Sequence, residues 1–547
     1  MKMQKKLVSV LAVSMLCAGL LSGCGDGTTT PTTTAAAIAE TAGSGSEGAE
    51  SAEAAESTHE EKMFHIALTA GFTGFDPLRT NDSASTYVNA QMYETLYRID
   101  PVTGEYNCLL AAEYPEFSED GMTATIKLRE GVTFHDGTPF NAEAVKYTIE
   151  LIKDPNFGSA RASIANSIDE VECPDDYTVV MHLAYEDGVL LAKLAHTNSA
   201  IVSPTAQQSQ DLMVDPCGTG PYRFVSSVSG SEVVLTRNDD YWGDKPAIKD
   251  VTMTYISEES TAVARMETGE ADFMPNLSVE QLDRVNAMES VTAETSEAAQ
   301  IYYMALRGDS YVNPVMAEKD FRIALAKAID KEGYVANILE GYADPAKSII
   351  GPKITGYDEE ATTHNIDYDP EGAKAILDAN PGWADEEILF LVPSTPAYTK
   401  MGEYFQANLK AAGFNNIKIE TIDWTAWLTE SKVDNRFDIT LAAWSNVTRD
   451  GSELMEPNFH SVNGAQRLRI PAEDAEVIDA YIEASKTTSD MSVRTENLLL
   501  TNAMLQDNAY VQPIYHNTNM YCYNKAYTGI TRDAGGTFYV MDFDYAE

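Results

Sequence analysis

Residues 128–153 read LREGVTFHDGTPFNAEAVKYTIELIK, and this stretch decides the fold prediction. It continues an alternating segment, 123–129, that predicts a half-buried strand. A turn follows at 135–139, where Asp-Gly and Thr-Pro are typical turn residues. Asn141 is a suitable N-cap for a helix that ends near residue 153. Three apolar residues lie on one face of this helix: Val145, Ile149 and Ile152.

Strand and helix patterns alternate beyond this stretch. The segment 251–255 predicts another half-buried strand. Helical patterns occupy five stretches: 141–153, 260–269, 320–340, 370–379 and 399–412. This mixture predicts an α/β or mixed α+β protein. The chain after residue 61 is longer than the roughly 250–300 residues at which one core stops growing, so we expect more than one domain.

The N-terminus has the pattern of a secretory signal. Three lysines precede an apolar stretch, 7–21, and the sequence Leu-Ser-Gly-Cys ends at Cys24. The apolar stretch is shorter than the roughly 20 residues that cross a bilayer. We therefore expect residues 1–23 to be a cleaved lipoprotein signal and Cys24 to carry a lipid anchor. Residues 24–61 are rich in Thr, Ala, Ser and Glu, and predict a disordered tether.

Charge and cysteine content narrow the possible partners. The chain has 84 Asp and Glu against 38 Lys and Arg, a formal net charge of −46. Binding to nucleic acid is disfavoured because nucleic acid is a polyanion. Four cysteines lie beyond the N-terminal region: Cys108, Cys173, Cys217 and Cys522. They lack metal-binding spacing, and disulfides and free thiols both stay open.

Catalytic and metal-binding motifs are absent from the sequence. It has no G-x-S-x-G, no H-E-x-x-H and no Walker loop, and 218–220 lacks the third glycine of a dinucleotide fingerprint. His135 lies in the turn, where we expect a structural role. Acidic residues in 367–378 have partial EF-hand spacing, but Asp369 followed by Pro370 favours a helix start. We therefore predict no enzyme, no metal site and no cofactor.

Further segments accompany the opening stretch in a fixed order. They are Gly74-Phe75-Asp76-Pro77, 93–101 (YETLYRIDP), 218–222 (GTGPY), 321–331 (FRIALAKAIDK) and Tyr368-Asp369-Pro370. Together with 128–153 they resemble the peptide/nickel family, family 5, of extracellular solute-binding proteins. Members of this family capture ligands for ABC importers. The resemblance runs from about residue 62 to the C-terminus.

The resemblance implies a fold and a domain organisation. It implies two lobes hinged around a cleft, a periplasmic-binding-protein-like fold with an inserted subdomain in lobe I. Carried onto this chain, lobe I comprises 62–107, 216–297 and 506–547. The inserted subdomain is 108–215, and lobe II is 298–505. We also expect a monomer.

Two charged ligand anchors of the family are missing here. Family members that bind short peptides hold the ligand ammonium with an aspartate three residues after a tryptophan. Trp444 matches that tryptophan, but Val447 stands at the aspartate position and Asp450 follows three residues later. Dipeptide binders also place an arginine before the helix that matches 399–412, and the loop 392–398 has none. Since a buried terminal charge without a partner is costly, longer peptides or neutral polar ligands such as sugars are favoured.

The resemblance places candidate ligand contacts around the cleft. These are Phe75, Ser394, Thr395, Tyr398, Trp444, Ser445, Asn446 and Asp450. For Trp444, core packing and ligand stacking stay open, whereas Trp424 and Trp427 are expected to pack in the core. His460 and His516 lack metal-ligand spacing, so a nickel site is not predicted.

The functional expectation combines the anchor with the resemblance. We expect a lipid-anchored receptor on the outer face of the cell membrane. It captures an oligopeptide or another small polar solute and delivers it to ABC permease subunits. Two alternatives stay open: a surface-anchored hydrolase, and a sensor of a peptide signal that does not transport it.

Overall fold

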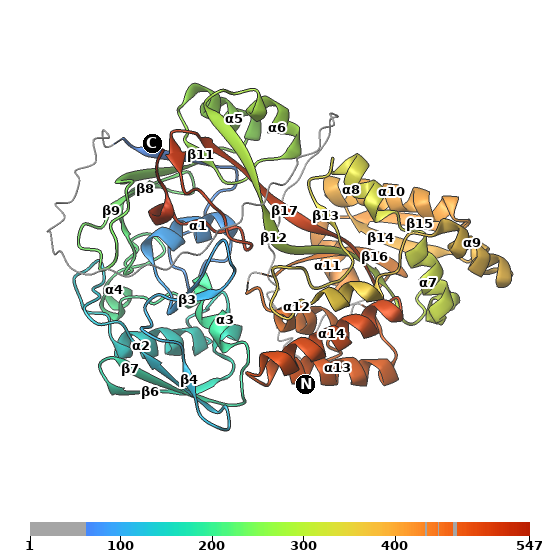
Figure 1. The fold of residues 1–547 in the computed structure, drawn as a ribbon, viewed down its shortest axis with the longest axis horizontal. Helices are drawn as coiled ribbons and strands as arrows, with labels where there is room; N and C mark the ends of the chain where they lie inside the picture. Colours follow the sequence, from blue (N-terminus) through green and yellow to red (C-terminus); the bar gives the residue numbers. More distant parts are fainter. Residues whose placement is uncertain (1–61, 433–434, 447, 463–467, 547) are drawn as a thin grey trace, which may run out of the picture.

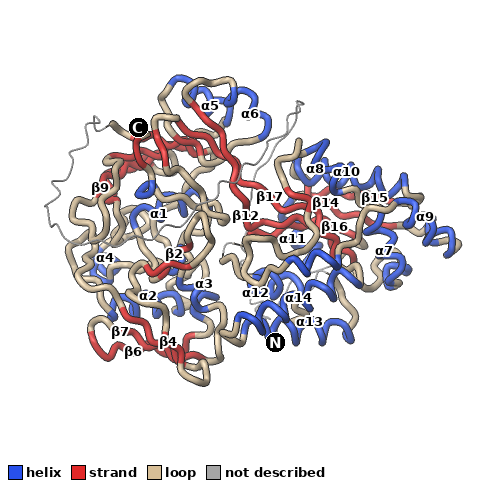
Figure 2. Tube along the Cα trace, in the orientation of Figure 1, coloured by secondary structure: helices blue, strands red, loops and turns tan. Residues whose placement is uncertain are grey.

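Two halves of the molecule are joined by a pair of long antiparallel strands (Figure 1). The computed structural model describes residues 62–432, 435–446, 448–462 and 468–546. The joining strands are β12 (Val291–Leu306) and β17 (Val511–Asn524). An eleven-stranded sheet runs through both halves in the order β15-β14-β16-β12-β17-β11-β1-β10-β9-β8, with β13 paired to β17. Figure 2 shows its strands passing from one half into the other.

The first half contains both ends of the described chain. Its strands are β1 (Phe64–Leu68), β2 (Tyr97–Ile99), β3 (Tyr106–Cys108), β8 (Tyr222–Val228), β9 (Glu232–Arg237), β10 (Asp250–Tyr255), β11 (Phe273–Met274), β18 (Tyr527–Thr528) and β19 (Asp544–Tyr545). Its helices are α1 (Ser83–Met92), α5 (Glu259–Thr268) and α6 (Val279–Asn286). Attached to this half is a four-stranded sheet in the order β4-β5-β7-β6. It comprises β4 (Glu116–Phe117), β5 (Thr123–Lys127), β6 (Ile168–Asp175) and β7 (Thr178–Leu183), with α2 (Ala142–Lys153), α3 (Leu190–Leu194) and α4 (Pro204–Ser209).

The second half is a sheet flanked by helices. Its strands are β13 (Asp344–Pro345), β14 (Ile388–Pro393), β15 (Ile417–Ile422) and β16 (Ile439–Ser445). Its helices are α7 (Lys319–Lys327), α8 (Lys331–Ile338), α9 (Pro370–Ala379), α10 (Pro396–Ala411), α11 (Trp424–Lys432), α12 (Gly451–Phe459), α13 (Ala472–Lys486) and α14 (Met491–Asp507). The two apolar clusters in this half include alternate residues of β12, among them Met304 and Tyr303. Within the described residues, no helix combines the length and the apolar character that a membrane crossing requires.

Residues 128–153 fold as their sequence predicts. The Asn141 side chain accepts a hydrogen bond from the backbone N–H of Ala144 at 3.2 Å and caps α2. The apolar face of α2 is fully buried: Val145, Ile149 and Ile152. In the preceding turn, the His135 backbone N–H donates to the Gly218 carbonyl, and its ring Nε2 lies 2.9 Å from the Gly220 carbonyl. His135 therefore has the structural role that the sequence predicts.

Segments of the family pattern pack against one another. Glu94 is buried and accepts hydrogen bonds from Thr219 (2.8 Å) and from Tyr241 (2.6 Å). A Cβ on Gly218 would lie 2.2 Å from the Met92 carbonyl oxygen, so only glycine permits this approach. The segments 93–101, 128–153 and 218–222 are thus parts of one scaffold in the first half.

The predicted helix over 320–340 is wrong in one respect, because it is two helices. α7 ends at Lys327, and α8 begins after Asp330. The Asp330 side chain accepts the backbone N–H of Gly333 and starts a new helix in the middle of an apolar pattern that looks continuous. The helix start at Asp369 and Pro370 is confirmed, since the Asp369 side chain accepts the N–H of Gly372.

Candidate ligand-binding site

The carboxyl ends of three strands meet at one edge of the second-half sheet. β14 is parallel to both β15 and β16. Ser394 and Thr395 follow β14, Trp424 begins the helix after β15, and Ser445 and Asn446 lie at the end of β16. In open α/β sheets, ligands bind at this edge. The fold therefore brings two separate predicted segments, around 394 and around 445, to the same side of the sheet.

The joining strands are interrupted where the two halves meet. The β12–β17 ladder shifts register between Glu297 and Ile301, so that 298–300 lies opposite Asn517. At this irregularity the Ala299 N–H donates to the Ala534 carbonyl of the first half at 2.8 Å. The Ala299 carbonyl accepts the N–H of Asn446 in the second half at 2.6 Å. The interruption is therefore hydrogen-bonded to both halves.

Side chains reinforce the same junction. Gln300 donates to the Ser445 hydroxyl at 2.8 Å and accepts from the Asn517 amide at 2.7 Å. This chain of hydrogen bonds links β16 to both joining strands. A pair of long strands whose register shifts between the two halves is a suitable hinge, because local bending there leaves both flanking ladders intact.

A cavity of about 360 Å³ lies at this junction. Its wall is formed by the strand interruption, by the segment 344–357 and by the start of α12; polar side chains on it include Glu297, Gln300, Lys353, Asn446, His516 and Asn517. The volume is within the range of about 300–1,000 Å³ typical of small-molecule sites. Burial lowers the pKa of His516 to about 4, so its imidazole is neutral at pH 7 and can donate and accept one hydrogen bond each.

The predicted residues from 444 to 446 approach this cavity to different degrees. Asn446 is buried and lines it. Ser445 does not line it but is bonded to Gln300, which does. Trp444 is half-buried, is paired with Ile301 across the sheet and packs against an apolar cluster of the second half. Core packing and ligand stacking therefore both stay open for Trp444.

The segment after β14 contributes an aromatic cluster at the same edge. Ser394 is exposed and Thr395 is half-buried. Tyr398 is buried, and its ring centroid lies 5.8 Å from that of Tyr302 and 5.9 Å from that of Trp424. Trp427 is buried, and its indole N–H donates to the Thr440 hydroxyl at 2.9 Å, which confirms packing for this residue. Trp424 is half-buried and stacks on Trp427 at 4.9 Å.

Asp450 and Phe75 occupy positions within the scaffold. Both carboxylate oxygens of Asp450 lie 2.6 Å from Nη2 of Arg494, and Asp450 also caps α12. Phe75 is in the first-half core, with its ring 5.4 Å from Phe224. Among the described residues, neither is part of the wall of the 360 Å³ cavity. A role in ligand binding stays a prediction for both.

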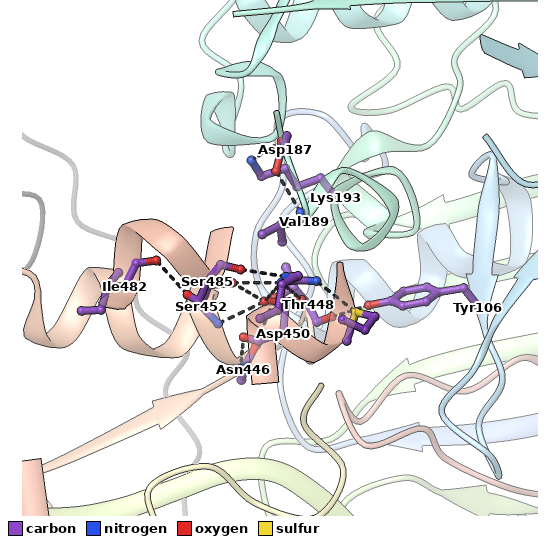
Figure 3. A network of polar contacts seen from close by, with 12 residues as sticks. Tyr106, Asp187, Val189, Lys193, Asn446, Thr448, Asp450, Ser452, Ile482 and Ser485 are labelled. Atoms are coloured by element: carbon purple, nitrogen blue, oxygen red, sulfur yellow. Dashed lines mark hydrogen bonds and ion pairs between the residues drawn. The ribbon is translucent and has the colours of Figure 1, made fainter. Parts of the chain in front are cut away.

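The two halves also touch away from the hinge. The Glu186 carboxylate accepts the N–H of Ser489 at 2.6 Å, and the Gly188 N–H donates to the Lys486 carbonyl at 2.8 Å. Figure 3 shows Tyr106 of the first half reaching Thr448, whose carbonyl its hydroxyl contacts at 3.2 Å. The halves are therefore closed on one another around the junction.

Sequence reasoning missed several polar residues at the junction. Gln300 and Asn517 become neighbours only through the pairing of β12 with β17, which no local pattern signals. Arg449 lies in the loop after Trp444, is 3% exposed and has a left-handed backbone with φ of +55°. The positive charge of Arg449, five residues after Trp444, is visible in the sequence, but its burial depends on the fold.

Histidines and cysteines of the described residues lie apart from one another or pair with other groups. No group of three or more His, Cys, Asp or Glu in this described part of the chain is placed to hold a metal ion. His460 contacts carboxylates on α13, at 3.7 Å from Asp479 and 3.2 Å from Glu483. The cysteines beyond the N-terminal region are free thiols: Cys108, Cys173, Cys217 and Cys522.

Two halves joined by two strands, with a cavity at the junction, define a hinged two-lobed binding protein. The sequence agrees with this class: residues 105–466 match the model of the family described as "Bacterial extracellular solute-binding proteins, family 5 Middle". The chain belongs to family 5 of the bacterial extracellular solute-binding proteins. It is accordingly a solute-binding protein rather than an enzyme.

Individual relatives support the same assignment. The chain is 32% identical to the glutathione-binding protein GsiB of Pectobacterium atrosepticum over 317 residues, which cover 57% of this chain and 60% of the relative. It is 27% identical to GsiB of Shigella flexneri over 444 residues, 79% of this chain and 84% of the relative. The solved structure of HbpA2 from Haemophilus parasuis superposes with a TM-score of 0.79 at 21% identity and covers 89% of this chain and all of that one.

Proposed function

We propose that this chain is the lipid-anchored receptor of an ABC importer and that it captures a peptide-like or other small polar solute between its halves. The observation that carries the proposal is the cavity at the strand interruption, where main chain of both halves is hydrogen-bonded to Ala299. The wall of this cavity comes from the joining strands and the second half, and the first half reaches it through the hydrogen bond between Ala299 and Ala534. We expect closure to bring first-half groups toward a solute held there. Binding therefore shifts the population toward the closed form, which the permease subunits recognise.

The proposed lobes follow the hinge. Lobe I comprises 62–107, 216–297 and 506–547, the subdomain 108–215 is inserted in it, and lobe II is 298–505. The register shift after Glu297 supports the boundary between 297 and 298. We propose that the protein works as a monomer, because one chain supplies both sides of the cavity.

Ligand contacts are proposed at the cavity and at the adjoining sheet edge. Asn446 supplies a buried amide, and Ser445, Ser394 and Thr395 supply hydroxyls near the same edge. Glutathione is the first solute to test, since two relatives are glutathione-binding proteins by name. Oligopeptides and oligosaccharides are the next candidates.

Calorimetric titration of the purified chain with glutathione, oligopeptide pools and oligosaccharides tests the proposal directly. We expect stoichiometric binding of one of these classes and recovery of the unchanged solute after denaturation, by mass spectrometry. Replacing Trp444 with alanine weakens binding by about 1–3 kcal/mol if the indole stacks on the solute. Trp383→Ala is the matched control, because Trp383 packs on Phe321 in the second-half core. Unchanged affinity in Trp444→Ala assigns Trp444 to the core.

The anchor is tested separately. Cys24 lies outside the described residues, and the proposal rests on the Leu-Ser-Gly-Cys sequence after the apolar stretch 7–21. Two acyl chains suffice for stable attachment to a membrane. Expressed in a bacterium, the chain should incorporate labelled palmitate, and Cys24→Ser should appear in the medium or periplasm. Membrane retention of the Cys24→Ser protein would contradict lipid anchoring.

A further inference from the structure

Two buried side chains of opposite charge, one from each half, meet where the halves touch. Nη2 of Arg449 in the second half lies 3.2 Å from Oδ2 of Asp533 in the first half. Arg449 is 3% exposed and Asp533 is 6% exposed. Their backbones adjoin residues of the cavity wall: the Arg449 N–H donates to the Asn446 carbonyl, and Ala534, next to Asp533, accepts the N–H of Ala299. Neither side chain of the pair is itself part of that wall.

The guanidinium of Arg449 is buried, but part of it lacks hydrogen-bond acceptors. Among the described residues, its Nε and Nη2 have no hydrogen-bond acceptor, and its contact with Asp533 lacks hydrogen-bond geometry. A buried donor without an acceptor costs free energy, and more so when it is charged. The loop holds Arg449 in place regardless, through the Thr355 N–H bonded to its carbonyl at 2.7 Å. Arg449 is therefore fixed in position while two of its guanidinium nitrogens still lack an acceptor.

Asp533 is held firmly on the opposite side. One carboxylate oxygen accepts the Thr537 N–H at 2.8 Å, and the Asp533 backbone N–H donates to the Thr537 carbonyl at 2.8 Å. Its second oxygen faces Arg449. Asp533 also lines a smaller cavity of about 70 Å³ in the first half. Each half thus presents one fixed charge at the closure surface.

We propose that Arg449 and Asp533 together bind the free α-amino-acid group of the solute, Arg449 through its carboxylate and Asp533 through its ammonium. This inference rests on the proposed function. A solute with only one charge would separate the pair and leave the other side chain buried and unpaired, which is costly. A group that carries both charges on one carbon replaces the ion pair with two complementary ones. It also gives Nε and Nη2 of Arg449 the acceptors that they lack, because a carboxylate fits the guanidinium fork.

The pair selects against ordinary linear peptides. The ammonium and carboxylate of such a peptide lie at opposite ends, separated by about 3.3–3.6 Å for each extended residue. Side-chain-linked peptides keep both charges together: the γ-glutamyl residue of glutathione retains its ammonium and carboxylate on the α-carbon. The proposed solute class is therefore amino acids and peptides joined through a side-chain carboxyl. The two anchors missing near Val447 and in 392–398 are replaced by a pair at other positions.

Changes to the solute test this inference on the unaltered protein. We expect glutathione to bind in calorimetric titrations. N-acetyl-glutathione, which lacks the ammonium, and the α-glutamyl isomer, which lacks the free α-carboxylate, should each bind about 30-fold more weakly or worse. Glutathione esterified at its glycine carboxylate is the matched control, because its γ-glutamyl group is intact, and it should lose little affinity.

Changes to the protein give the complementary test. Arg449→Gln and Asp533→Asn should each weaken glutathione binding by about 30-fold or more. Asp533→Asn should not weaken the binding of N-acetyl-glutathione any further, because that ligand already lacks the ammonium that Asp533 binds. Arg284→Gln is the control for loss of an arginine, since Arg284 pairs with Glu267 on the surface of the first half. Circular dichroism of each variant establishes that it is folded.

Three outcomes overturn the inference. Equal binding of glutathione and N-acetyl-glutathione would do so, as would unchanged glutathione affinity in folded Arg449→Gln. Binding of a linear oligopeptide or a sugar, with no binding of glutathione or free amino acids, would overturn the inference and leave the proposed function standing. Failure to bind any solute class would overturn the proposed function itself.

Discussion

At the scale of single residues, burial decides what a charged side chain can do. Asp450 is 1% exposed and pairs with Arg494, which is 3% exposed. The loop that carries Asp450 also carries Arg449, and the two side chains differ in how many of their polar atoms are hydrogen-bonded. Asp450 has a full set of partners, whereas Arg449 has donors without acceptors. In the sequence the two residues are adjacent charged positions, and only the packing separates their roles.

Removing the Asp450 charge should destabilise the protein. Asp450→Asn leaves the Arg494 guanidinium buried without its counterion, so we expect the free energy of unfolding to fall by about 3–5 kcal/mol in urea titrations. Asp378→Asn is the control, because Asp378 forms an exposed ion pair with Lys374 and should change stability by less than about 1 kcal/mol. Equal free energies of unfolding for Asp450→Asn and Asp378→Asn would show that the buried pair stabilises the fold no more than the exposed pair does.

Two histidines should make stability depend on pH. Burial lowers the pKa of both His135 and His516 to about 4, below the value of about 6.5 in an unfolded chain. Between pH 6.5 and pH 4 the unfolded chain therefore binds more protons, and the free energy of unfolding falls as the pH falls through this window. A shift of this size corresponds to at most about 3 kcal/mol for each group.

Comparison with a variant isolates this contribution from that of the many carboxylates. His516→Gln should lose less stability than the parent chain between pH 6.5 and pH 4.5, as measured by urea unfolding at each pH. His182→Gln serves as the control and should follow the parent chain, because the side chain of His182 on β7 is 43% exposed. Parallel curves for the parent and His516→Gln would contradict the lowered pKa of His516.

At the scale of elements, the sequence predicted those helix starts that depend on neighbouring residues in the chain. The helix α2, with its cap at Asn141, and the helix start at Asp369 follow from residues within one turn. The break between α7 and α8 was missed because the apolar spacing continues through 328–330. The joining strands were missed for another reason: β12 begins with a largely polar run, 292–298, whose strand character depends on pairing with β17.

The α2 cap provides a test at this scale. Asn141→Ala removes the acceptor for the Ala144 N–H, and we expect the free energy of unfolding to fall by about 1 kcal/mol. Asn141→Asp retains an acceptor and should restore most of the loss. Because α2 lies with the four-stranded sheet and is not part of the 360 Å³ cavity wall, solute affinity should stay the same in both variants. A loss in Asn141→Asp as large as that in Asn141→Ala would indicate that the amide donor, rather than the cap, is responsible.

At the scale of the whole molecule, the family pattern marks the scaffold more than the ligand. Glu94, His135 and Thr219 hold the first half together, and Lys331 is buried with its ammonium on the carbonyl of Ala346. These residues predict the fold rather than the ligand, because their hydrogen bonds join separate segments of the scaffold and none of the four lines the 360 Å³ cavity. The cavity wall is assembled from segments far apart in sequence, such as 297–301 and 344–354. Ligand identity was therefore beyond the reach of the sequence patterns.

Closure of the halves has its own test, remote from the cavity. A Cβ on Gly188 would lie 1.8 Å from the Thr488 carbonyl oxygen, across the contact between the halves. Gly188→Ala should therefore favour the open form, increase the radius of gyration in X-ray scattering and weaken solute binding, with the unfolding transition little changed. Gly71→Ala is the control, since its nearest contact would be 3.4 Å within the first half. Scattering curves that coincide for the parent and Gly188→Ala would contradict a closure that depends on this contact.

The paired strands that join the halves have a mechanical consequence. Because β12 and β17 are hydrogen-bonded to each other on both sides of the interruption, sliding one strand along the other would break a whole ladder at once. Bending at 298–300 breaks none of those bonds. We therefore expect the halves to move by bending about this junction rather than by sliding, so that the same surfaces meet at each closure. Under the proposed function, a permease would then meet the same relative orientation of the halves in every closed form.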